Sequence, residues 1–270
     1  MSSARTTIDF DRHGKQIGFI DIAHSPHEDA WGATRIPLAV IKNGTGPTVI
    51  LEGGNHGDEY EGPIPLGEMI RELDPAEVSG RLIILPALNT PAVGAGQRTS
   101  PVDGLNINRS FPGDPLGTIT QQIAAYMDEV ILPMGDAFLD LHSGGSSLNI
   151  MPSAAIEPTP DPVLRKKNIA AVLAFDAPVT VVIDNLGDTR TAMATAVRHG
   201  LVAVGTEMAG AGTVSLDALG ICRRGVRNVL AHLGVLPPTG ATPKSRPEMI
   251  LRIPGPEGFV LATTDGVFEP

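Results

Sequence analysis

The sequence predicts an α/β fold with a mixed, mostly parallel central sheet. Short apolar runs suited to buried strands alternate with segments of helical periodicity from residue 48 to residue 233. Glycine, proline, asparagine and aspartate separate these segments, as turns require. The chain has 270 residues, 42% of them hydrophobic and 19% charged. That length suffices for one large domain, or for one domain and a small appendage.

The predicted elements follow one another along the chain. Two early strands are expected at 16–24 and 34–42, and Asn43-Gly44 marks the turn after them. Apolar runs predict further strands at 48–52, 81–85, 137–141, 178–183 and 201–206. Apolar residues at helical spacing predict helices at 63–73, 119–131, 162–175, 189–199 and 215–233. Such alternation is typical of a sheet whose strands run largely parallel.

Two segments depart from this alternation. Residues 90–117 predict a long loop rich in Gly, Pro, Asn and Asp, and loops of that length in a compact domain are usually functional. A Pro- and Thr-rich stretch at 237–247 predicts a linker, and 248–262 predicts short strands. We therefore expect a main domain over 1–240, and at 248–270 the truncated start of a small β-rich C-terminal domain.

Composition and charge argue against several classes of partner. The net charge is −10, and the short basic runs at 165–167 and 223–224 do not form the patch expected of a nucleic-acid binder. No apolar run approaches the roughly 20 residues of a membrane helix. The single cysteine, Cys222, excludes an internal disulfide, which fits the cytoplasm, and we expect it to be a small buried apolar residue. The sequence does not determine the oligomeric state, and a homo-oligomer is compatible with it.

Four side chains with the chemistry of a metal site follow three of the expected strands. His56 and Glu59 come shortly after the first strand, His142 directly after the second and Glu207 directly after the third. If these strands are parallel neighbours, their carboxyl ends meet at one edge of the sheet. Two imidazoles and a carboxylate are zinc ligands that leave a position for water. Glu207 is then the candidate acid/base, which takes a proton from water and delivers it to a leaving amine.

Each of these pieces is a weak signal by itself. A His-x-x-Glu motif is commonly a surface turn, and a histidine or glutamate at a strand end is usually an ordinary residue. Glycines surround His56, and Asp140 precedes His142 by two residues. A ligating histidine often has such a carboxylate behind it, which favours the metal site.

Two arginines lie in the long loop at 90–117. The guanidinium groups of Arg98 and Arg109 suit a substrate carboxylate, and they could also stabilise a tetrahedral oxyanion. The alternative for Arg109 is an ion pair with Asp103 or Asp114 that only holds the loop together.

Taken together, the motifs span residues 48–212. They are Gly53-Gly-Asn-His56-Gly-Asp-Glu59, Arg98, Asp103-Gly-Leu-Asn-Ile-Asn108-Arg109, Asp140-Leu-His142-Ser-Gly-Gly and Thr206-Glu207. In this order they resemble the succinylglutamate desuccinylase/aspartoacylase family of zinc carboxypeptidase-like hydrolases. The resemblance implies a three-layer α/β/α catalytic domain that depends on zinc, followed by a small β domain. It further implies zinc ligands at His56, Glu59 and His142, acid/base catalysis by Glu207, carbonyl polarisation by Arg98, and binding of the substrate carboxylate by Asn108 and Arg109.

Further stretches resemble one subgroup of that family, the N-acetyl-diaminobutyrate deacetylases of ectoine degradation. These stretches are His24-Ser-Pro with Ala30-Trp31-Gly32, residues 55–63, residues 98–104 and residues 225–230. The resemblance implies hydrolysis of N-alpha-acetyl-L-2,4-diaminobutyrate to diaminobutyrate and acetate, with this small-molecule N-acyl amino acid as the partner. An acid such as Asp184 or Asp188 could meet its side-chain ammonium. The alternative is another N-acyl amino acid, as in an aspartoacylase or a desuccinylase.

Three other functions are weaker alternatives. A serine hydrolase would need a G-x-S-x-G elbow, which the sequence lacks. A nucleotide-binding protein is suggested by Gly210-Ala-Gly212, but Ser215 stands where the third glycine should be. A non-enzymatic binding module would require that the metal site be degenerate, which metal analysis of the protein would decide.

Overall fold

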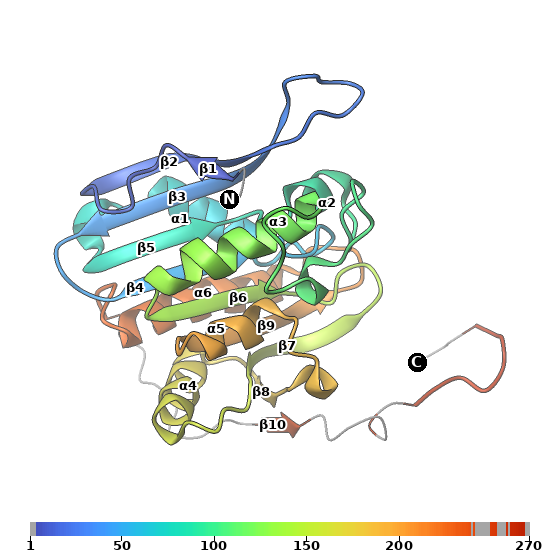
Figure 1. Cartoon of the computed structure of the whole chain (residues 1–270). Helices are drawn as coiled ribbons and strands as arrows, with labels where there is room; N and C mark the ends of the chain where they lie inside the picture. Colours follow the sequence, from blue (N-terminus) through green and yellow to red (C-terminus); the bar gives the residue numbers. More distant parts are fainter. Residues whose placement is uncertain (1–3, 239, 241–248, 253–257, 259, 268–270) are drawn as a thin grey trace.

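The computed structural model describes residues 4–238, 240, 249–252, 258 and 260–267. Its centre is a ten-stranded sheet with the order β1-β2-β3-β5-β4-β6-β9-β7-β8-β10 (Figure 1). The strands are β1 (Arg5–Thr6), β2 (Gly14–Ala23), β3 (Ala33–Asn43), β4 (Thr48–Gly53), β5 (Gly80–Leu85), β6 (Ala137–His142), β7 (Asn149–Ile156), β8 (Val179–Val182), β9 (Val202–Gly210) and β10 (Met249–Arg252).

The parallel strands occupy the middle of this sheet. β5, β4, β6 and β9 run parallel to one another. The β2–β3 hairpin pairs antiparallel to β5, and β7 pairs antiparallel to β9. β8 and β10 then run parallel to β7. The prediction of a mixed, mostly parallel sheet is therefore confirmed.

Helices cover both faces of the sheet, which gives three layers. The helices are α1 (Pro63–Glu72), α2 (Thr90–Ala95), α3 (Ile119–Tyr126), α4 (Pro162–Phe175), α5 (Ala192–Arg198) and α6 (Leu216–His232). In the view of Figure 1, α3 and α5 lie in front of the sheet. Side chains of α1, α4 and α6 pack in one core cluster and those of α3 and α5 in the other.

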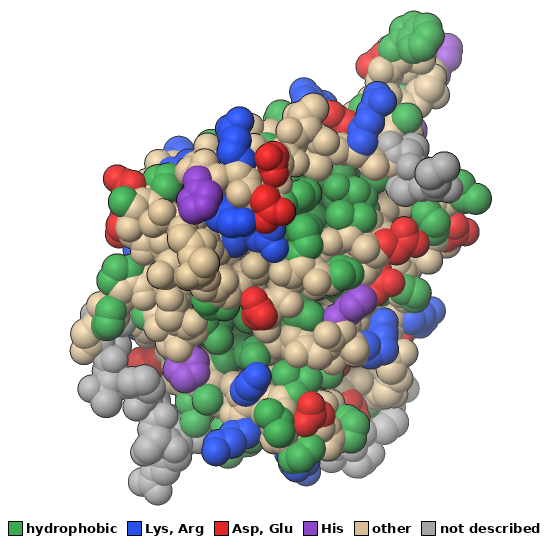
Figure 2. All heavy atoms as spheres, turned by 60° about the vertical axis from the view of Figure 1, so that its left-hand side comes forward, with side chains coloured by type: hydrophobic (Ala, Val, Ile, Leu, Met, Phe, Trp, Pro, Cys, Tyr) green, Lys and Arg blue, Asp and Glu red, His purple; other side chains and the backbone are tan. Residues whose placement is uncertain are grey.

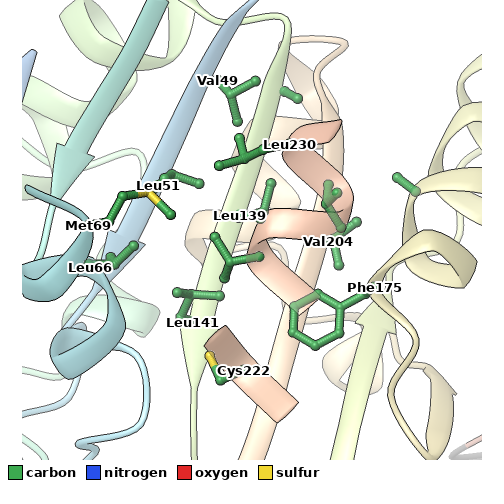
Figure 3. Packing of buried hydrophobic residues seen from close by; sticks show 14 of the residues in the cluster. Val49, Leu51, Leu66, Met69, Leu139, Leu141, Phe175, Val204, Cys222 and Leu230 are labelled. Atoms are coloured by element: carbon green, nitrogen blue, oxygen red, sulfur yellow. The ribbon is translucent and has the colours of Figure 1, made fainter. Parts of the chain in front are cut away.

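Alternation of side chains along β4 supplies both cores. Val49 and Leu51 belong to the cluster with α1, α4 and α6, whereas Ile50 between them belongs to the cluster with α3 and α5. Successive residues of a strand point to opposite faces, so a buried parallel strand must be apolar throughout. Figure 3 shows Leu51 beside Met69 of α1 in the first cluster.

The structure departs from the predicted elements in three places. The strand β7 (Asn149–Ile156) lies where the sequence predicted no helix or strand. The predicted loop at 90–117 contains α2 and a short 3₁₀ turn at Ile107–Arg109. The predicted helix at 119–131 ends as α3 at Tyr126 and continues as a π turn through Ile131. Proline and glycine in this segment favoured the prediction of a loop over that of a helix. Pro91 is nevertheless compatible with α2, because it occupies the first turn, where its missing N–H costs nothing.

The last strand joins the main sheet. β10 pairs with β8 from Met249↔Val179 to Arg252↔Val182. Of the predicted linker at 237–247, residues 239 and 241–247 lie outside the described residues. Of the expected β-rich segment at 248–270, residues 248, 253–257, 259 and 268–270 lie outside them as well. The division into a domain at 1–240 and a second domain at 248–270 stays a prediction.

Cys222 is a small buried residue, as the sequence predicted. Cys222 is fully buried in the core, where burial raises the pKa of its thiol to about 12. On the face drawn in Figure 2, basic side chains are interspersed with acidic ones. Within the described residues, the search for a helix with the length and hydropathy of a membrane span finds none.

Candidate metal centre and active site

The register of the parallel strands brings the predicted site residues to one edge of the sheet. Gly53 at the end of β4 pairs with Leu141 of β6, so that the loop after β4 starts beside His142. His142, the last residue of β6, pairs with Glu207 of β9. The glycine-rich loop that begins after Gly53 then carries His56 and Glu59 to this edge. The convergence expected from parallel neighbouring strands is thus observed.

The three predicted ligands form a compact buried cluster. Nδ1 of His56 lies 2.7 Å from Oε1 of Glu59, and Nδ1 of His142 lies 2.8 Å from Oε2 of the same carboxylate. One potential ligand atom from each of the three residues lies within 4.8 Å of those of the other two. All three residues are buried, with exposures of 2% to 8%. The two Nδ1 atoms and the carboxylate therefore face a common point.

The outer nitrogen of each histidine has its own oxygen partner. Nε2 of His142 lies 2.9 Å from Oδ1 of Asp140, the carboxylate that the sequence placed behind it. Nε2 of His56 lies 3.1 Å from Oδ1 of Asn106. A proton on Nε2 of each ring, which faces one of these oxygens, leaves the lone pair of Nδ1 directed at the cluster. This is the tautomer that a metal-binding histidine needs.

The ionised carboxylate of Glu59 gives the cluster the negative charge that a cation site requires. Burial works to raise the pKa of Glu59, but the charges and hydrogen bonds of His142 and His56 outweigh it and hold that pKa far below its usual value. Burial lowers the pKa of His56. For His142 burial also acts to lower the pKa, but Asp140 and Glu59 overcome it and raise the pKa well above normal. An ionised carboxylate thus lies between two imidazoles.

Backbone packing fixes the loop that carries His56 and Glu59. Gly57 has no room for a side chain, because a Cβ there would lie 1.9 Å from the carbonyl oxygen of Ala92 in α2. The N–H of Gly57 donates to the carbonyl of Gln97 at 2.8 Å. The short helix α2, hidden within the predicted loop, is therefore what holds the ligand loop in place.

Asp58 fixes the second ligand-bearing segment, the loop after β6. Its Oδ2 accepts hydrogen bonds of 2.8 Å from both the N–H and the hydroxyl of Ser146. The N–H of Ser143 in the same segment donates to Oε2 of Glu59 at 3.1 Å. The residue between the two ligands of the first loop thereby ties that loop to the segment that follows His142.

Glu207 is placed beside the cluster, on the wall of the same cavity. Burial raises the pKa of Glu207 to about 8, with the charge of His142 opposing this and Glu59 and Asp140 adding to it. A carboxyl group with a raised pKa can hold a proton near neutral pH and release it to a leaving group. This environment suits the acid/base role that the sequence suggested for Glu207.

The two arginines and Asn108 also line the cavity. Arg98 Nη1 lies 3.3 Å from Oε1 of Glu59, which places this guanidinium at the cluster. Asn108 accepts from the N–H of Ala192 through its Oδ1 at 2.8 Å, and its Nδ2 lies 3.4 Å from Nε2 of His142. The amide of Asn108 thus links the loop to the first turn of α5.

Arg109 pairs with an acid that the sequence analysis had not considered for it. Its Nε lies 3.2 Å from Oδ2 of Asp188, and its Nη1 donates to the carbonyl of Asn108. Asp103, one of the partners considered from the sequence, instead accepts from the N–H and hydroxyl of Thr120. The ion pair with Asp188 holds the guanidinium of Arg109 at the cavity wall.

Neither acid considered for a substrate ammonium is placed as expected. Asp188 is bound by Arg190 through Nε at 3.0 Å and Nη2 at 2.9 Å, in addition to Arg109. Asp184 accepts from the N–H of Leu186 and borders a separate groove of about 530 Å³. The charge of Asp188 is therefore already matched, and Asp184 lines that groove and not the cavity at the cluster.

The cavity that joins these groups has a volume of about 130 Å³. One end is formed by the cluster, Arg98 and Glu207. The remaining wall comes from the segments of β7 and β8 and from the start of α5. Its residues include Leu148, Ile150, Ala155, Val181, Ile183, Asn185, Thr191 and Met193. A cavity of this size, with polar groups at one end and apolar side chains along it, is suited to a small amphipathic molecule.

Sequence reasoning missed Asn106, Asp58 and the cavity wall. Asn106 and Asp58 lie inside the quoted motifs, so their position beside named residues was the available signal. The wall had no signal of this kind, because its residues are ordinary apolar side chains brought together by β7, which was itself not predicted.

The residues present fit a divalent metal ion. Two Nδ1 lone pairs and one ionised carboxylate converge, and the outer nitrogens are held by Asp140 and Asn106. Mixed nitrogen and oxygen donors in this number are a binding set for a catalytic metal that keeps an open position. The cluster His56, Glu59 and His142 could therefore hold one ion.

Comparison with known proteins supports this assignment at the level of the family. A curated relative, the N-alpha-acetyl-L-2,4-diaminobutyric acid deacetylase of Halomonas elongata, is 43% identical over 99% of this chain and 78% of its own length. A solved succinylglutamate desuccinylase/aspartoacylase from Rhodobacter sphaeroides has a TM-score of 0.91 at 43% identity, covering 100% of this chain and 81% of that chain. The product-bound ectoine utilization protein EutE (DoeB) from Ruegeria pomeroyi has a TM-score of 0.89 at 43% identity, covering 94% and 76%.

The match to a family model agrees with these relatives. Residues 45–233 match the succinylglutamate desuccinylase/aspartoacylase catalytic domain, and this range contains every predicted ligand and Glu207. The resemblance stated from the motifs is confirmed: the chain belongs to the succinylglutamate desuccinylase/aspartoacylase family.

Proposed function

We propose that the chain is a zinc-dependent amidohydrolase that removes the acetyl group from an N-acetyl amino acid. The substrate we propose is N-alpha-acetyl-L-2,4-diaminobutyrate, with acetate and 2,4-diaminobutyrate as products. The activity that the Halomonas elongata relative carries in its name supports this substrate. We also propose that the reaction belongs to ectoine degradation.

One observation carries the proposal: the metal-ligand cluster and a carboxyl group of raised pKa line the same small cavity. His56, Glu59 and His142 form one end of it, and Glu207 stands beside them. A metal and an adjacent acid/base are the two parts that hydrolysis of an amide requires. The volume of about 130 Å³ suits a small amino acid derivative better than a peptide.

The residues would share the reaction as follows. His56, Glu59 and His142 would hold the zinc ion, which when bound would supply a Lewis acid for activating water and polarising the acetyl carbonyl. Glu207 takes the proton from the attacking water. Because burial raises the pKa of Glu207, its carboxyl group keeps that proton until the amide C–N bond breaks, and then gives it to the departing amine.

The arginines would bind the charges that form or persist during the reaction. Arg98, beside Glu59, donates to the carbonyl oxygen as it becomes an oxyanion. Arg109 and Nδ2 of Asn108 bind the substrate carboxylate from the cavity wall. The ion pair of Arg109 with Asp188 orients the guanidinium for this contact.

The test is activity on a panel of substrates with and without a chelator. We expect hydrolysis of N-alpha-acetyl-2,4-diaminobutyrate, its loss on treatment with a chelator, and its recovery on addition of zinc. The panel should include the N-gamma-acetyl isomer, N-acetylaspartate and N-succinylglutamate. Faster hydrolysis of either of the last two would replace the substrate with that of an aspartoacylase or a desuccinylase. No hydrolysis of any member by the zinc-loaded chain would reject the function.

The cytoplasmic location and a homo-oligomeric state stay predictions from the sequence.

A further inference from the structure

Beyond Glu207 the cavity continues as a hollow lined by small and apolar residues. Ala155 of β7 pairs with Gly205 of β9 on one side and with Val181 of β8 on the other, and all three line the cavity. Met193 of α5 closes this hollow, since a Cβ on Gly205 would stand 2.8 Å from its sulfur. The space exists because glycine and alanine occupy neighbouring positions of the sheet.

Glu157 lies behind the wall of this hollow, where it is hydrogen-bonded to Thr191, a residue that lines the cavity. It follows Ala155 by two residues, so it lies on the same face of the extended chain. The N–H of Ile183 donates to the carbonyl of Ile156 at 3.1 Å, which continues the strand pairing to this point. Glu157 is only 8% exposed, and it lines the 530 Å³ groove and not the cavity itself. On the cavity side, the hydroxyl of Thr191 donates to its Oε1 at 3.2 Å.

In the described part of the chain, the carboxylate of Glu157 accepts hydrogen bonds from neutral side chains. The hydroxyl of Thr191 and the side chain of Asn185 hydrogen-bond to Glu157, and both residues line the cavity. Arg198 is close enough for its charge to act on Glu157, but it donates to a backbone carbonyl and to a threonine hydroxyl, both at 2.7 Å. Burial accordingly raises the pKa of Glu157 to about 7.

We propose that Glu157, with Thr191 and Asn185 at the cavity wall, recognises the side-chain ammonium group of the amino-acid half of the substrate. The inference rests on the proposed function. An ammonium has three N–H donors, and the hydroxyl oxygen of Thr191, the amide oxygen of Asn185 and the carboxylate behind them are acceptors. A neutral side chain of equal length would fill the hollow and leave the buried carboxylate without a counter-charge, which is unfavourable.

The placement of the ammonium also agrees with the rest of the cavity. Glu207 and the metal ligands line the cavity where the acetyl amide must react, and Thr191 and Asn185, which hydrogen-bond to Glu157, line it as well. Arg109 also lines the cavity, and the α-carboxylate would bind there. The apolar side chains of Val181 and Met193 would then contact the methylene groups of 2,4-diaminobutyrate.

The experiment compares two substrates in the wild type and in Glu157→Gln. The substrates are N-alpha-acetyl-2,4-diaminobutyrate and N-acetylnorvaline, in which a methyl group replaces the ammonium. For the wild type we expect kcat/KM at least about tenfold higher for the cationic substrate. In Glu157→Gln we expect that kcat/KM to fall about tenfold or more, mainly through KM, while the value for N-acetylnorvaline changes less than about threefold. Inhibition by free 2,4-diaminobutyrate should weaken in parallel.

The matched control is Asp184→Asn, which removes an acid from the neighbouring segment and keeps an oxygen able to accept from Leu186. This variant should retain the wild-type preference for N-alpha-acetyl-2,4-diaminobutyrate over N-acetylnorvaline. Equal losses on both substrates in Glu157→Gln would show a structural role and overturn the inference. So would unchanged kinetics, or a zinc-loaded wild type that hydrolyses N-acyl amino acids without preferring the cation. A wild type inactive on every N-acyl amino acid would reject the proposed function itself, and the inference with it.

Discussion

The metal end of the cavity and its opposite end are built in different ways. At the metal end, the ligands lie at or just after the ends of adjacent parallel strands, and each histidine nitrogen has a named partner. The opposite end is formed by the antiparallel strand β7, by β8 and by the segment before α5, in which Asn185 and Leu186 adopt positive φ. The first region specifies a reaction, whereas the second specifies the shape of a small molecule. Changes in the second should therefore alter substrate preference and leave the metal bound.

The largest effect should come from removing the acid/base at the metal end. Glu207→Gln keeps the shape of the side chain but cannot take a proton from water. We expect kcat to fall by about a thousandfold or more, with zinc content unchanged. Steady-state kinetics together with metal analysis of the same preparation checks this. Substantial remaining activity in a zinc-loaded Glu207→Gln chain would remove Glu207 from the proposed mechanism.

A smaller effect should follow from weakening the support behind a ligand. Asp140→Asn removes the carboxylate that faces Nε2 of His142 at 2.9 Å. Loss of such a partner typically weakens metal binding by about 10- to 100-fold, which competition with a chelator would measure. Asp128→Asn is the control, because Asp128 pairs with Nε2 of His199 at 2.8 Å far from the site. If both variants bind zinc like the wild type, Asp140 does not support the ligand.

The same difference between the two regions explains how much the sequence could predict. His56, Glu59, His142 and Glu207 each follow an apolar run, so strand ends and chemistry together located the metal end. Glu59 and His142 are 83 residues apart, but a parallel sheet brings strand ends together whatever the length of chain between them.

The opposite end could not be located in this way. Asn149–Ile156 contains Pro152 and three small residues, and its N-terminal half is partly exposed, so no strand pattern was recognised. β7 is held by β9 and β8 on its two sides, which is a tertiary effect that a local pattern does not contain. Without β7 the sequence could not place Ala155 beside Gly205 or Glu157 beside Thr191, so Asp184 and Asp188 were the acids it indicated for the substrate ammonium.

A third prediction concerns the space between the two ends. Gly205→Ala places a methyl group 2.8 Å from the sulfur of Met193, and both residues line the cavity, so the added methyl group and the displaced side chain would reduce its volume. We expect kcat/KM for the diaminobutyrate substrate to fall about tenfold, with zinc affinity unchanged. Gly220→Ala in α6, where an added Cβ meets nothing within 4 Å, is the control and should keep full activity. A Gly205→Ala chain that loses zinc would show that the two ends are not independent.

The smallest effect should appear in stability as a function of pH. Burial raises the pKa of Glu157 from the ordinary 4.5 to about 7, so between these values the folded chain keeps a proton that the unfolded chain has lost. The contribution of Glu157 to stability therefore falls as pH rises through this window. Glu157→Gln cannot ionise, so its melting temperature relative to the wild type should rise by a few degrees, roughly 3 °C, between pH 5 and pH 8. A flat difference for Glu157→Gln would mean that this carboxylate is already matched by a cation in the free protein.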